Sequence, residues 1–315
     1  MRDLRIVFMG TPDFAVGILE ELMAKNTNVV GVITAPDKPA GRGRKLMQSA
    51  VKKYALSQDL TVLQPLNLKD DGFLRQLKLL NANLQIIVAF RMLPKVVWSM
   101  PEYGTFNLHA SLLPNYRGAA PINWAIINGE HKTGVTTFFI DEHIDTGEII
   151  ASSEIEISED ETVGTLHDKL MTLGKKLVAH TTELISKGDI QTKAQSSIAS
   201  LKEAPKLTQE NTRIDWTVNA KEIDTFIRGL SPYPAAWCIL ENGVEQIKVK
   251  IYEAAIDQET HTHEIGELFA TKKQLRIAIK GGYLDIKEIQ LPGKRKMEVS
   301  ALLNGYSFHK NSNLL

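Results

Sequence analysis

The chain has 315 residues, of which 43% are hydrophobic and 23% are charged, with 37 basic and 37 acidic side chains. These values exclude a disordered chain and any overall positive charge, and the length suits two domains of about 100–200 residues each. The single cysteine, Cys238, excludes an intramolecular disulfide and agrees with a cytoplasmic location. Cys238 stands in the apolar stretch 235–240, so we expect a buried strand residue rather than a reactive thiol.

The start of the chain predicts no targeting segment. Residues 1–8 pass directly into a strand-like run, without the apolar core and cleavage site of a signal peptide. No apolar run reaches the ~18–20 residues of a membrane-spanning helix. We therefore expect neither export nor insertion into a membrane.

The first half of the chain alternates short apolar runs with amphipathic segments. Strands that alternate with helices form parallel sheets, so this half predicts an α/β fold with a Rossmann-like, doubly wound, mostly parallel sheet. The turn 10–13 lacks the G-x-G-x-x-G pattern of dinucleotide-binding loops, and Thr11 as a helix cap with Pro12 in the first turn explains it structurally. The expected strands are 4–9, 29–34, 84–89, 104–108 and 133–140, and the expected helix is 13–24.

The second half begins with a long helix and then changes character. Residues 163–187 predict that helix, and 188–206 lose periodicity and gather Gln, Ser, Lys and Pro. Short alternating stretches then predict a small C-terminal antiparallel β-barrel of the OB type. We expect a sheet domain at 1–189, a linker at 190–206 and the barrel domain at 207–315. Barrel strands are expected at 235–240, 246–255, 275–278 and 284–290, with a helix at 220–229.

Three polar side chains follow two neighbouring expected strands. Asn107 and His109 end one strand, and Asp145 lies beyond the end of the next. Ligands of open parallel sheets collect outside the carboxyl ends of the strands. An amide donor, an imidazole that titrates near neutral pH and an orienting carboxylate suit transfer of a small acyl group to an amine. Asparagine and aspartate also occur in turns for backbone reasons, so spacing alone leaves both interpretations open.

The same region offers a metal site as an alternative. Asp141, His143 and Asp145 alternate, and side chains that alternate along an extended segment point to one side. His109 and His131 are further candidate ligands. No recognised ligand spacing such as H-E-x-x-H is present, so we expect no metal.

A basic segment stands out on this neutral chain. Residues 36–53 contain six basic side chains and a single acidic one, Asp37. Such runs are usually solvated surface loops, although they also bind nucleic acid.

Several motifs in order along the chain closely resemble the folate-dependent formyltransferases. The most specific is Asn-Leu-His-Ala-Ser-Leu-Leu-Pro at 107–114, followed by Tyr-Arg-Gly-Ala-Ala-Pro-Ile at 116–122 and His-Ile-Asp-Thr-Gly-Glu-Ile at 143–149. The resemblance extends to the runs 6–14, 36–44 and 228–237. It covers nearly the whole chain.

The resemblance implies a particular reaction. The co-substrate would be 10-formyltetrahydrofolate, and the acceptor would be the α-amino group of methionine on initiator tRNA, for translation initiation by a monomer. Asn107, His109 and Asp145 match the catalytic trio of the family. The segment that lines the folate site matches Ser111, Leu112, Leu113 and Pro114.

The resemblance also implies where tRNA binds. The basic loop would meet the acceptor stem, and its Arg42 would sense the weak first base pair of the initiator. The barrel domain would lie along the tRNA, although 207–315 carries fourteen basic and fourteen acidic side chains and must rely on local clusters, such as 272–273 and 294–296. The expected tRNA contacts in the loop are Lys38, Arg42, Arg44 and Lys45.

The sequence departs from the family at Arg91, where an aromatic residue is usually followed by glycine. That turn lines the pterin pocket in the family, and arginine excludes an easy left-handed conformation there. The rival functions are formyl transfer to glycinamide ribonucleotide or to an amino sugar nucleotide, release of formate from folate by hydrolysis, and RNA binding by an inactive sheet domain. The basic loop, the barrel and the intact trio disfavour them.

Overall fold

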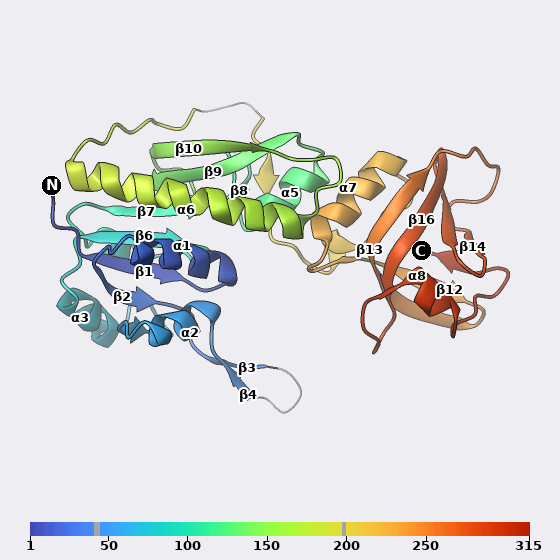
Figure 1. Ribbon diagram of the computed structural model, residues 1–315, viewed down its shortest axis with the longest axis horizontal. Coiled ribbons are helices and arrows are strands. Elements are labelled where there is room, and N and C mark those ends of the chain that lie inside the picture. The colour runs from blue at the N-terminus through green and yellow to red at the C-terminus, as the bar shows by residue number, and fades with distance from the viewer. Residues whose placement is uncertain (41–44, 197–199) are drawn as a thin grey trace. The chain divides into compact units, whose positions relative to one another are not determined.

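The computed structural model describes residues 1–40, 45–196 and 200–315 (Figure 1). The chain divides into two compact units. Unit 1 comprises residues 1–118, 133–155 and 167–203, and unit 2 comprises residues 119–132, 156–166 and 204–315.

Unit 1 is built around a mostly parallel sheet with the strand order β10-β9-β7-β6-β1-β2-β5. In the sheet, the adjacent strands β5, β2, β1, β6 and β7 run parallel to one another, and β9 runs antiparallel to β7. The predicted α/β fold is confirmed. The strands are β1 (Ile6–Gly10), β2 (Val29–Ile33), β5 (Val62–Leu63), β6 (Leu84–Val88), β7 (Thr105–His109), β9 (Lys132–Phe139) and β10 (Ile149–Glu156).

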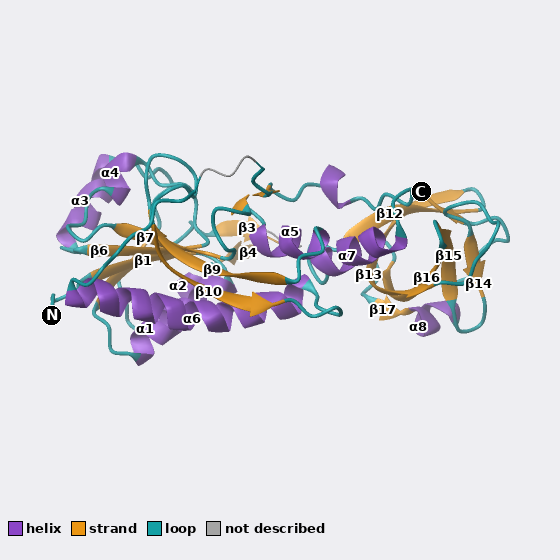
Figure 2. Cartoon of the chain, turned by 90° about the horizontal axis from the view of Figure 1, so that it is seen from above, coloured by secondary structure: helices purple, strands orange, loops and turns teal. Residues whose placement is uncertain are grey.

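Helices cover both faces of this sheet, as Figures 1 and 2 show. Val7, Met9 and Ile87 point to one face, where they form a buried cluster with α3 and α4. On the other face α6 packs so closely on β7 that a Cβ on Gly174 would lie 2.8 Å from Leu108, and α1 packs so closely on α6 that a Cβ on Gly17 would lie 2.6 Å from Met171. The helices of this half are α1 (Asp13–Ala24), α2 (Ala50–Ser57), α3 (Asp71–Leu79), α4 (Lys95–Trp98) and α6 (Val163–Lys187).

The local sequence explains the start of α1, with one correction. The helix spans Asp13–Ala24 as predicted, but its N-cap is Pro12, and no side chain caps it. The predicted cap at Thr11 is therefore wrong. Pro12 needs no partner for a backbone N–H, so the helix starts without a side-chain acceptor.

The basic segment is more structured than a loop. Its two sides form a hairpin of β3 (Lys38–Ala40) and β4 (Lys45–Met47), in which Lys38 pairs with Met47 and Ala40 with Lys45. Residues 41–44 lie outside the described part of the chain.

Unit 2 contains an antiparallel barrel, which confirms the predicted OB-type domain. Its strand order is β14-β15-β16-β13-β12-β18, with β17 beside β16, and a bridge between Glu267 and Asn313 brings the two edges together. The strands are β12 (Ala236–Asn242), β13 (Glu245–Asp257), β14 (Leu268–Ala270), β15 (Leu275–Ile279), β16 (Gly282–Gln290), β17 (Met297–Glu298) and β18 (Asn313–Leu314).

Apolar side chains at alternate positions of the barrel strands point inward and form the core of the barrel. Cys238 and Leu240 on β12 and Val249 and Ile251 on β13 are fully buried. Burial raises the pKa of the Cys238 thiol, so the residue is the inert strand position that was predicted. The helices of unit 2 are α5 (Pro121–Ile127), η1 (Glu210–Thr212), a short 3₁₀ helix, α7 (Ala220–Leu230) and α8 (Val299–Leu303).

Residues 190–206, the expected linker, make specific backbone contacts. Lys193 exchanges two hydrogen bonds with Ile149 of β10, and Lys202 accepts one from the amide of Tyr116. β8 (Arg117–Gly118) pairs with β11 (Glu203–Ala204). Within the ranges that the structure describes, no helix is long and apolar enough to cross a membrane.

Candidate active site

The end of strand β7 carries two of the three predicted catalytic side chains. Asn107 and His109 are two residues apart, so they point to the same face of the sheet, the face on which Ile87 lies beside Asn107 in register. Both lie at the carboxyl edge of the parallel strands, where α/β proteins bind ligands.

His109 is buried, with 6% of its surface exposed, and its two ring nitrogens face different partners. Nε2 lies 2.7 Å from the backbone carbonyl oxygen of Tyr116, and Nδ1 lies 3.8 Å from Asp145 Oδ2. A carbonyl oxygen only accepts hydrogen bonds, so Nε2 carries a proton and donates it. Nδ1 is therefore the nitrogen that is free to gain or lose a proton. The 3.8 Å gap is too long for a hydrogen bond and short enough for an ion pair with a protonated ring.

Backbone geometry holds Asp145 in place. Its Oδ2 accepts a hydrogen bond of 3.0 Å from the amide of Gly118, and its own φ is +55°. Two residues later Gly147 lies so close to β9 that a Cβ would come within 1.7 Å of the carbonyl oxygen of Phe139. Only glycine fits there, which accounts for the last residue of the His-Ile-Asp-Thr-Gly motif.

Gln195 supports this loop, and sequence reasoning missed it. Its Nε2 donates to the carbonyl oxygens of Asp145 (2.9 Å) and Gly147 (2.8 Å), and Arg117 donates to its Oε1 at 2.6 Å. Gln195 lies in the segment expected to be a linker. A polar residue in a non-periodic segment carries no signal of this role.

Asn107 has an incomplete set of hydrogen bonds. Its Oδ1 is buried and accepts no hydrogen bond within the described part of the chain. A buried amide oxygen without a partner costs roughly 1–3 kcal/mol, so a ligand that donates a hydrogen bond to this oxygen would recover that free energy.

The segment that follows β7 is tied to β9 through one hydroxyl. Thr136 Oγ1 donates to the carbonyl oxygen of Ser111 at 2.7 Å and accepts from the amide of Leu113 at 3.2 Å. Ser111 Oγ donates to the carbonyl oxygen of Asn115. Ser111 and Leu113 are buried, whereas Leu112 and Pro114 are partly exposed. Thr136 thus fixes the path of the predicted folate segment, which sequence reasoning did not foresee.

The alternative metal site is not formed. Residues 141–147 form turns instead of an extended segment, so the premise that their side chains point to one side is wrong. Asp141 Oδ1 accepts from the amide of His143 and from Thr146 Oγ1, which makes it a turn residue. No three His, Cys, Asp or Glu side chains gather as metal ligands in the ranges described.

The basic segment keeps part of its charge at the surface. Lys38 is exposed, and the backbone of Lys45 belongs to β4, whereas Arg42 and Arg44 lie outside the described residues. At the root of the hairpin, hydrogen bonds from Gln64 and from Lys52, which lies at 2.6 Å, hold the pKa of Asp37 below its usual value.

Arg91 does not adopt the left-handed conformation that glycine would provide; Ala89 does, at φ +47°. The Arg91 guanidinium donates instead to the carbonyl oxygens of Pro65 and Leu66. It therefore ties the loop after β6 to the segment after β5.

A basic and aromatic surface lies on the outside of the barrel in unit 2. Lys248 and Lys250 point outward because the alternate residues are buried. Lys248 Nζ stands 3.7 Å from the ring centroid of Trp237, and Arg213 stands 5.6 Å from it. Burial and, next, the charge of Lys250 lower the pKa of Lys248. We call this surface, made by Arg213, Trp237, Lys248, Lys250 and Tyr252, the outer barrel face.

The sequence matches known protein families over both units. The family model "Formyl transferase" matches residues 4–182, and "Formyl transferase, C-terminal domain" matches residues 206–307. The chain belongs to the formyl transferase family and is an enzyme that transfers formyl groups.

The curated relatives narrow this class. The chain is 61% identical over 308 residues to a protein of Flavobacterium johnsoniae named methionyl-tRNA formyltransferase, covering 98% of each chain. It is 51% identical over 309 residues to a protein of that name from Bacteroides thetaiotaomicron, covering 96% of each.

Solved structures share the fold at lower identity. HypX from Aquifex aeolicus, in complex with tetrahydrofolic acid, aligns with a TM-score of 0.62 at 19% identity over 96% of this chain and 47% of that one. WlaRD, a sugar 3N-formyl transferase, aligns with a TM-score of 0.62 at 20% identity over 94% and 100% of the two chains. At such identity the likeness concerns the fold alone.

Proposed function

We propose that this enzyme transfers the formyl group of 10-formyltetrahydrofolate to the α-amino group of methionine carried by initiator tRNA. The observation that carries the proposal is the arrangement of Asn107, His109 and Asp145 at the carboxyl edge of the sheet. The name of the Flavobacterium johnsoniae relative supports the acceptor. The folate-bound structure of HypX supports the donor class.

The reaction would proceed through a tetrahedral intermediate. The neutral amine attacks the formyl carbon, a C–N bond forms, and the carbonyl oxygen gains negative charge. The bond from that carbon to the folate nitrogen then breaks, and the proton lost by the amine ends on the departing nitrogen. The protein must stabilise the oxyanion and move one proton, neither of which requires a metal.

His109 is suited to carry the proton. Because Nε2 is engaged with the Tyr116 carbonyl, Nδ1 would take the proton from the attacking amine and pass it on. Asp145 stands 3.8 Å away and would stabilise the imidazolium while it exists. Its own position is set by the Gly118 amide, so the pair needs little rearrangement during the reaction.

Asn107 would act on both substrates. Its Oδ1, which has no partner within the described part of the chain, would accept a hydrogen bond from the incoming amine. Its Nδ2 would donate to the developing oxyanion, a contribution of about 3–4 kcal/mol for a well-placed donor. Bonding to the amine would satisfy the buried oxygen and orient the nucleophile.

The folate would lie against Ser111, Leu112, Leu113 and Pro114, which continue from the strand that carries His109. Thr136 holds this segment at two points, so the donor would meet a preformed surface. Residues 1–189 would then form the catalytic domain, 190–206 a linker and 207–315 a tRNA-binding domain.

The tRNA would contact two basic surfaces, one in each unit. Lys38, Arg42, Arg44 and Lys45 of the hairpin segment would meet the acceptor stem, which makes binding salt-dependent. In unit 2 the outer barrel face combines cations with aromatic rings, the composition of surfaces that bind single-stranded or distorted nucleic acid. A phosphate beside Lys248 would relieve its repulsion from Lys250. We expect a monomer that acts in the cytoplasm, where translation begins.

The direct test combines the purified enzyme, 10-formyltetrahydrofolate and methionylated tRNA. We expect formylmethionyl-tRNA from the initiator, and a much lower kcat/KM with elongator methionyl-tRNA. Equal rates on the two tRNAs would refute the proposed role of the hairpin segment. The sugar 3N-formyl transferase WlaRD motivates a second acceptor class. If the enzyme formylated amino sugar nucleotides and did not formylate methionyl-tRNA, an amino sugar would replace methionyl-tRNA as the proposed acceptor.

A further inference from the structure

One short segment of the backbone holds two of the catalytic side chains. The carbonyl oxygen of Tyr116 accepts a hydrogen bond from His109 Nε2 at 2.7 Å. Two residues later, the amide of Gly118 donates to Asp145 Oδ2 at 3.0 Å. The distance between the imidazole and the carboxylate therefore depends on how this segment lies against the loop that carries Asp145.

The side chain between these two backbone groups leads to Gln195. Arg117 donates to Gln195 Oε1 from Nε at 3.2 Å and from Nη2 at 2.6 Å. Gln195 Nε2 donates to the carbonyl oxygens of Asp145, at 2.9 Å, and Gly147, at 2.8 Å. A side-chain amide has two N–H donors and an oxygen that accepts twice, so all four are used. Exchanging the oxygen and the nitrogen would place an NH₂ group against the guanidinium, so the contacts fix the orientation of the amide.

Backbone pairing places Gln195 beside the loop. Lys193 and Ile149 form an antiparallel bridge with hydrogen bonds of 2.8 and 2.9 Å. Two residues farther along each antiparallel chain, Gln195 comes opposite Gly147. Beyond it, β11 pairs with β8. Backbone contacts therefore fix the chain on both sides of Gln195.

The loop of Asp145 depends on such contacts for its position. Residues 142–144 are exposed, so the loop gains little from packing there. Asp145 has a φ of +55°, a left-handed conformation that non-glycine residues rarely adopt and that persists where surrounding contacts impose it. Its Oδ2 lies 3.8 Å from His109 Nδ1, so a small displacement of the loop would weaken the interaction of the carboxylate with a protonated ring.

We propose that Gln195 is a positioning residue for formyl transfer, whose two donated hydrogen bonds hold Asp145 where its carboxylate stabilises the imidazolium of His109. The inference rests on the proposed function, in which His109 carries the proton. Gln195 acts through Asp145 and not through either substrate, and Arg117 orients its amide. The segment 190–206 is then more than a linker, because the catalytic site of unit 1 is incomplete without it.

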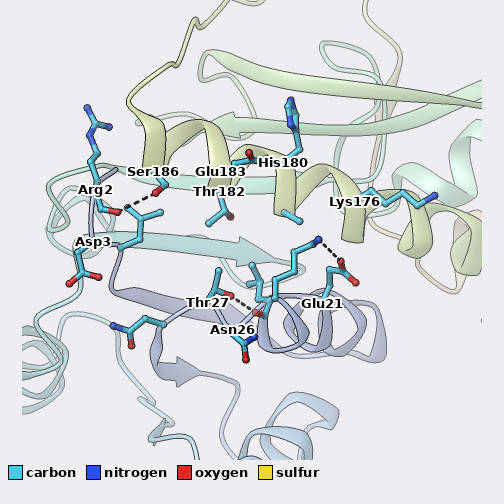
Figure 3. Close-up of a pocket in the computed structure, with 15 residues that line it drawn as sticks. Arg2, Asp3, Glu21, Asn26, Thr27, Lys176, His180, Thr182, Glu183 and Ser186 are labelled. Atoms are coloured by element: carbon cyan, nitrogen blue, oxygen red, sulfur yellow. Dashed lines mark hydrogen bonds and ion pairs between the residues drawn. The ribbon is translucent and has the colours of Figure 1, made fainter.

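Polar contacts at the opposite edge of the same sheet have a different role (Figure 3). A hollow of about 580 Å³ lies there, at the amino ends of the strands. Ser186 Oγ donates to the carbonyl oxygen of Arg2 at 3.2 Å, and Lys25 lies 3.6 Å from Glu21. The first contact ties α6 to the start of the chain, far from the carboxyl edge. Ser186 therefore provides a structural control for Gln195.

The test is a double-mutant cycle between Gln195 and Asp145. Gln195→Glu keeps an acceptor for Arg117 and replaces the two donors by an oxygen that repels both carbonyls, whereas Gln195→Met removes the donors without adding charge. Each change should lower kcat about 10- to 100-fold, with the KM for tRNA and for the folate donor within about twofold. In an Asp145→Ala background the same changes should lower kcat by less than about twofold, because the side chain through which Gln195 acts is absent.

Two control variants remove hydrogen bonds that do not lead to Asp145. Thr192→Val removes a bond from the same segment to Glu148, and Ser186→Ala removes the bond at the opposite edge. Both should keep kcat within about twofold of the unaltered enzyme. Urea unfolding of every variant shows whether it is folded at the temperature of the kinetic measurements.

Hydrogen exchange of the Gly118 amide provides a readout without turnover. The carboxylate of Asp145 protects this amide, so Gln195→Glu and Gln195→Met should raise its exchange rate about tenfold or more, as followed by NMR of the ¹⁵N-labelled protein. Thr192→Val should leave the rate unchanged.

The inference would be overturned if both Gln195 variants kept full kcat, or if their losses were equal in the two backgrounds, which would assign Gln195 a purely structural role. An unchanged exchange rate of the Gly118 amide would also contradict it. Full kcat in Asp145→Ala alone would instead remove Asp145 from the proposed mechanism, and the exchange measurement would still decide whether Gln195 holds the loop. The two proposals therefore fail separately.

Discussion

The end of strand β7 and the outer barrel face use their polar side chains in opposite ways. At β7, His109 is buried and meets backbone groups and the carboxylate of Asp145 at fixed distances. On the barrel, Lys248 and Lys250 lie partly exposed beside an aromatic ring. Proton transfer demands fixed geometry, whereas attraction of a polyanion demands only charge of one sign. Changes at β7 should therefore alter kcat, and changes on the barrel should alter tRNA affinity and its salt dependence.

The largest effect is expected from His109→Ala. Removing the proton carrier should lower kcat about 10²–10⁴-fold, the usual contribution of general acid–base catalysis. The KM for tRNA should stay within about twofold, because the imidazole is buried and is not among the side chains proposed to contact tRNA. Steady-state kinetics with initiator methionyl-tRNA measures both. His143→Ala is the matched control, since that exposed imidazole lies in the loop of Asp145 and should be silent. Survival of kcat within a few-fold in His109→Ala would remove the residue from the mechanism.

The barrel provides the contrasting prediction. Lys248→Gln combined with Lys250→Gln should raise the KM for tRNA about tenfold and reduce the slope of log affinity against log salt by up to about 2, with kcat unchanged. Filter binding at several salt concentrations measures the slope. Lys272→Gln with Lys273→Gln removes the same charge from another exposed cluster. If that control changes the slope more, tRNA contacts the barrel elsewhere.

Much of the fold, and the three catalytic candidates, could be predicted from the sequence. Helix α1 follows from its amphipathic pattern, and β6 from the apolar run that begins at Ile86, which is buried as far as the end of the strand at Val88. The approach of His109 to Asp145 was predicted, but from a wrong premise, because the two strands do not end at one edge. β9 runs antiparallel to β7, so its last residue, Phe139, pairs with Phe106 near the start of β7, and Asp145 reaches His109 through the loop that follows β9. Backbone partners could not be predicted: the carbonyl of Tyr116 and the amide of Gly118 carry no side-chain signal. Gln195 and Thr136 were missed because their partners lie 23 to 78 residues away in the sequence.

Thr136→Val tests whether the folate segment is preformed. Valine has the same shape, but the amide of Leu113 and the carbonyl of Ser111 would both lose a buried partner. We expect a loss of about 1–3 kcal/mol in the free energy of unfolding and a few-fold higher KM for the folate donor. Urea unfolding and donor kinetics measure the two effects. Thr137→Val is the control: its hydroxyl bonds to Thr181, so stability should fall while the donor KM stays constant. Equal donor KM in both variants would argue against Thr136 as the support of that segment.

The smallest expected effect is a change in the pH dependence of stability, and it concerns a residue inside the barrel rather than on its outer face. Burial raises the pKa of Cys238, so the folded protein keeps the thiol proton at pH values where the unfolded chain, with an ordinary pKa of about 8.5, releases it. Above that pH the unfolded state binds fewer protons than the folded state, and stability falls by up to about 1.4 kcal/mol per pH unit. Cys238→Ala has no thiol, so its stability lacks this fall with rising pH. The difference in unfolding free energy between the two proteins should therefore narrow from pH 7.5 to pH 9.5, as followed by urea unfolding. If the two proteins showed parallel pH profiles, or if the thiol of the folded protein were alkylated rapidly, the barrel would open at Cys238. The strands that carry the outer barrel face would then be mobile.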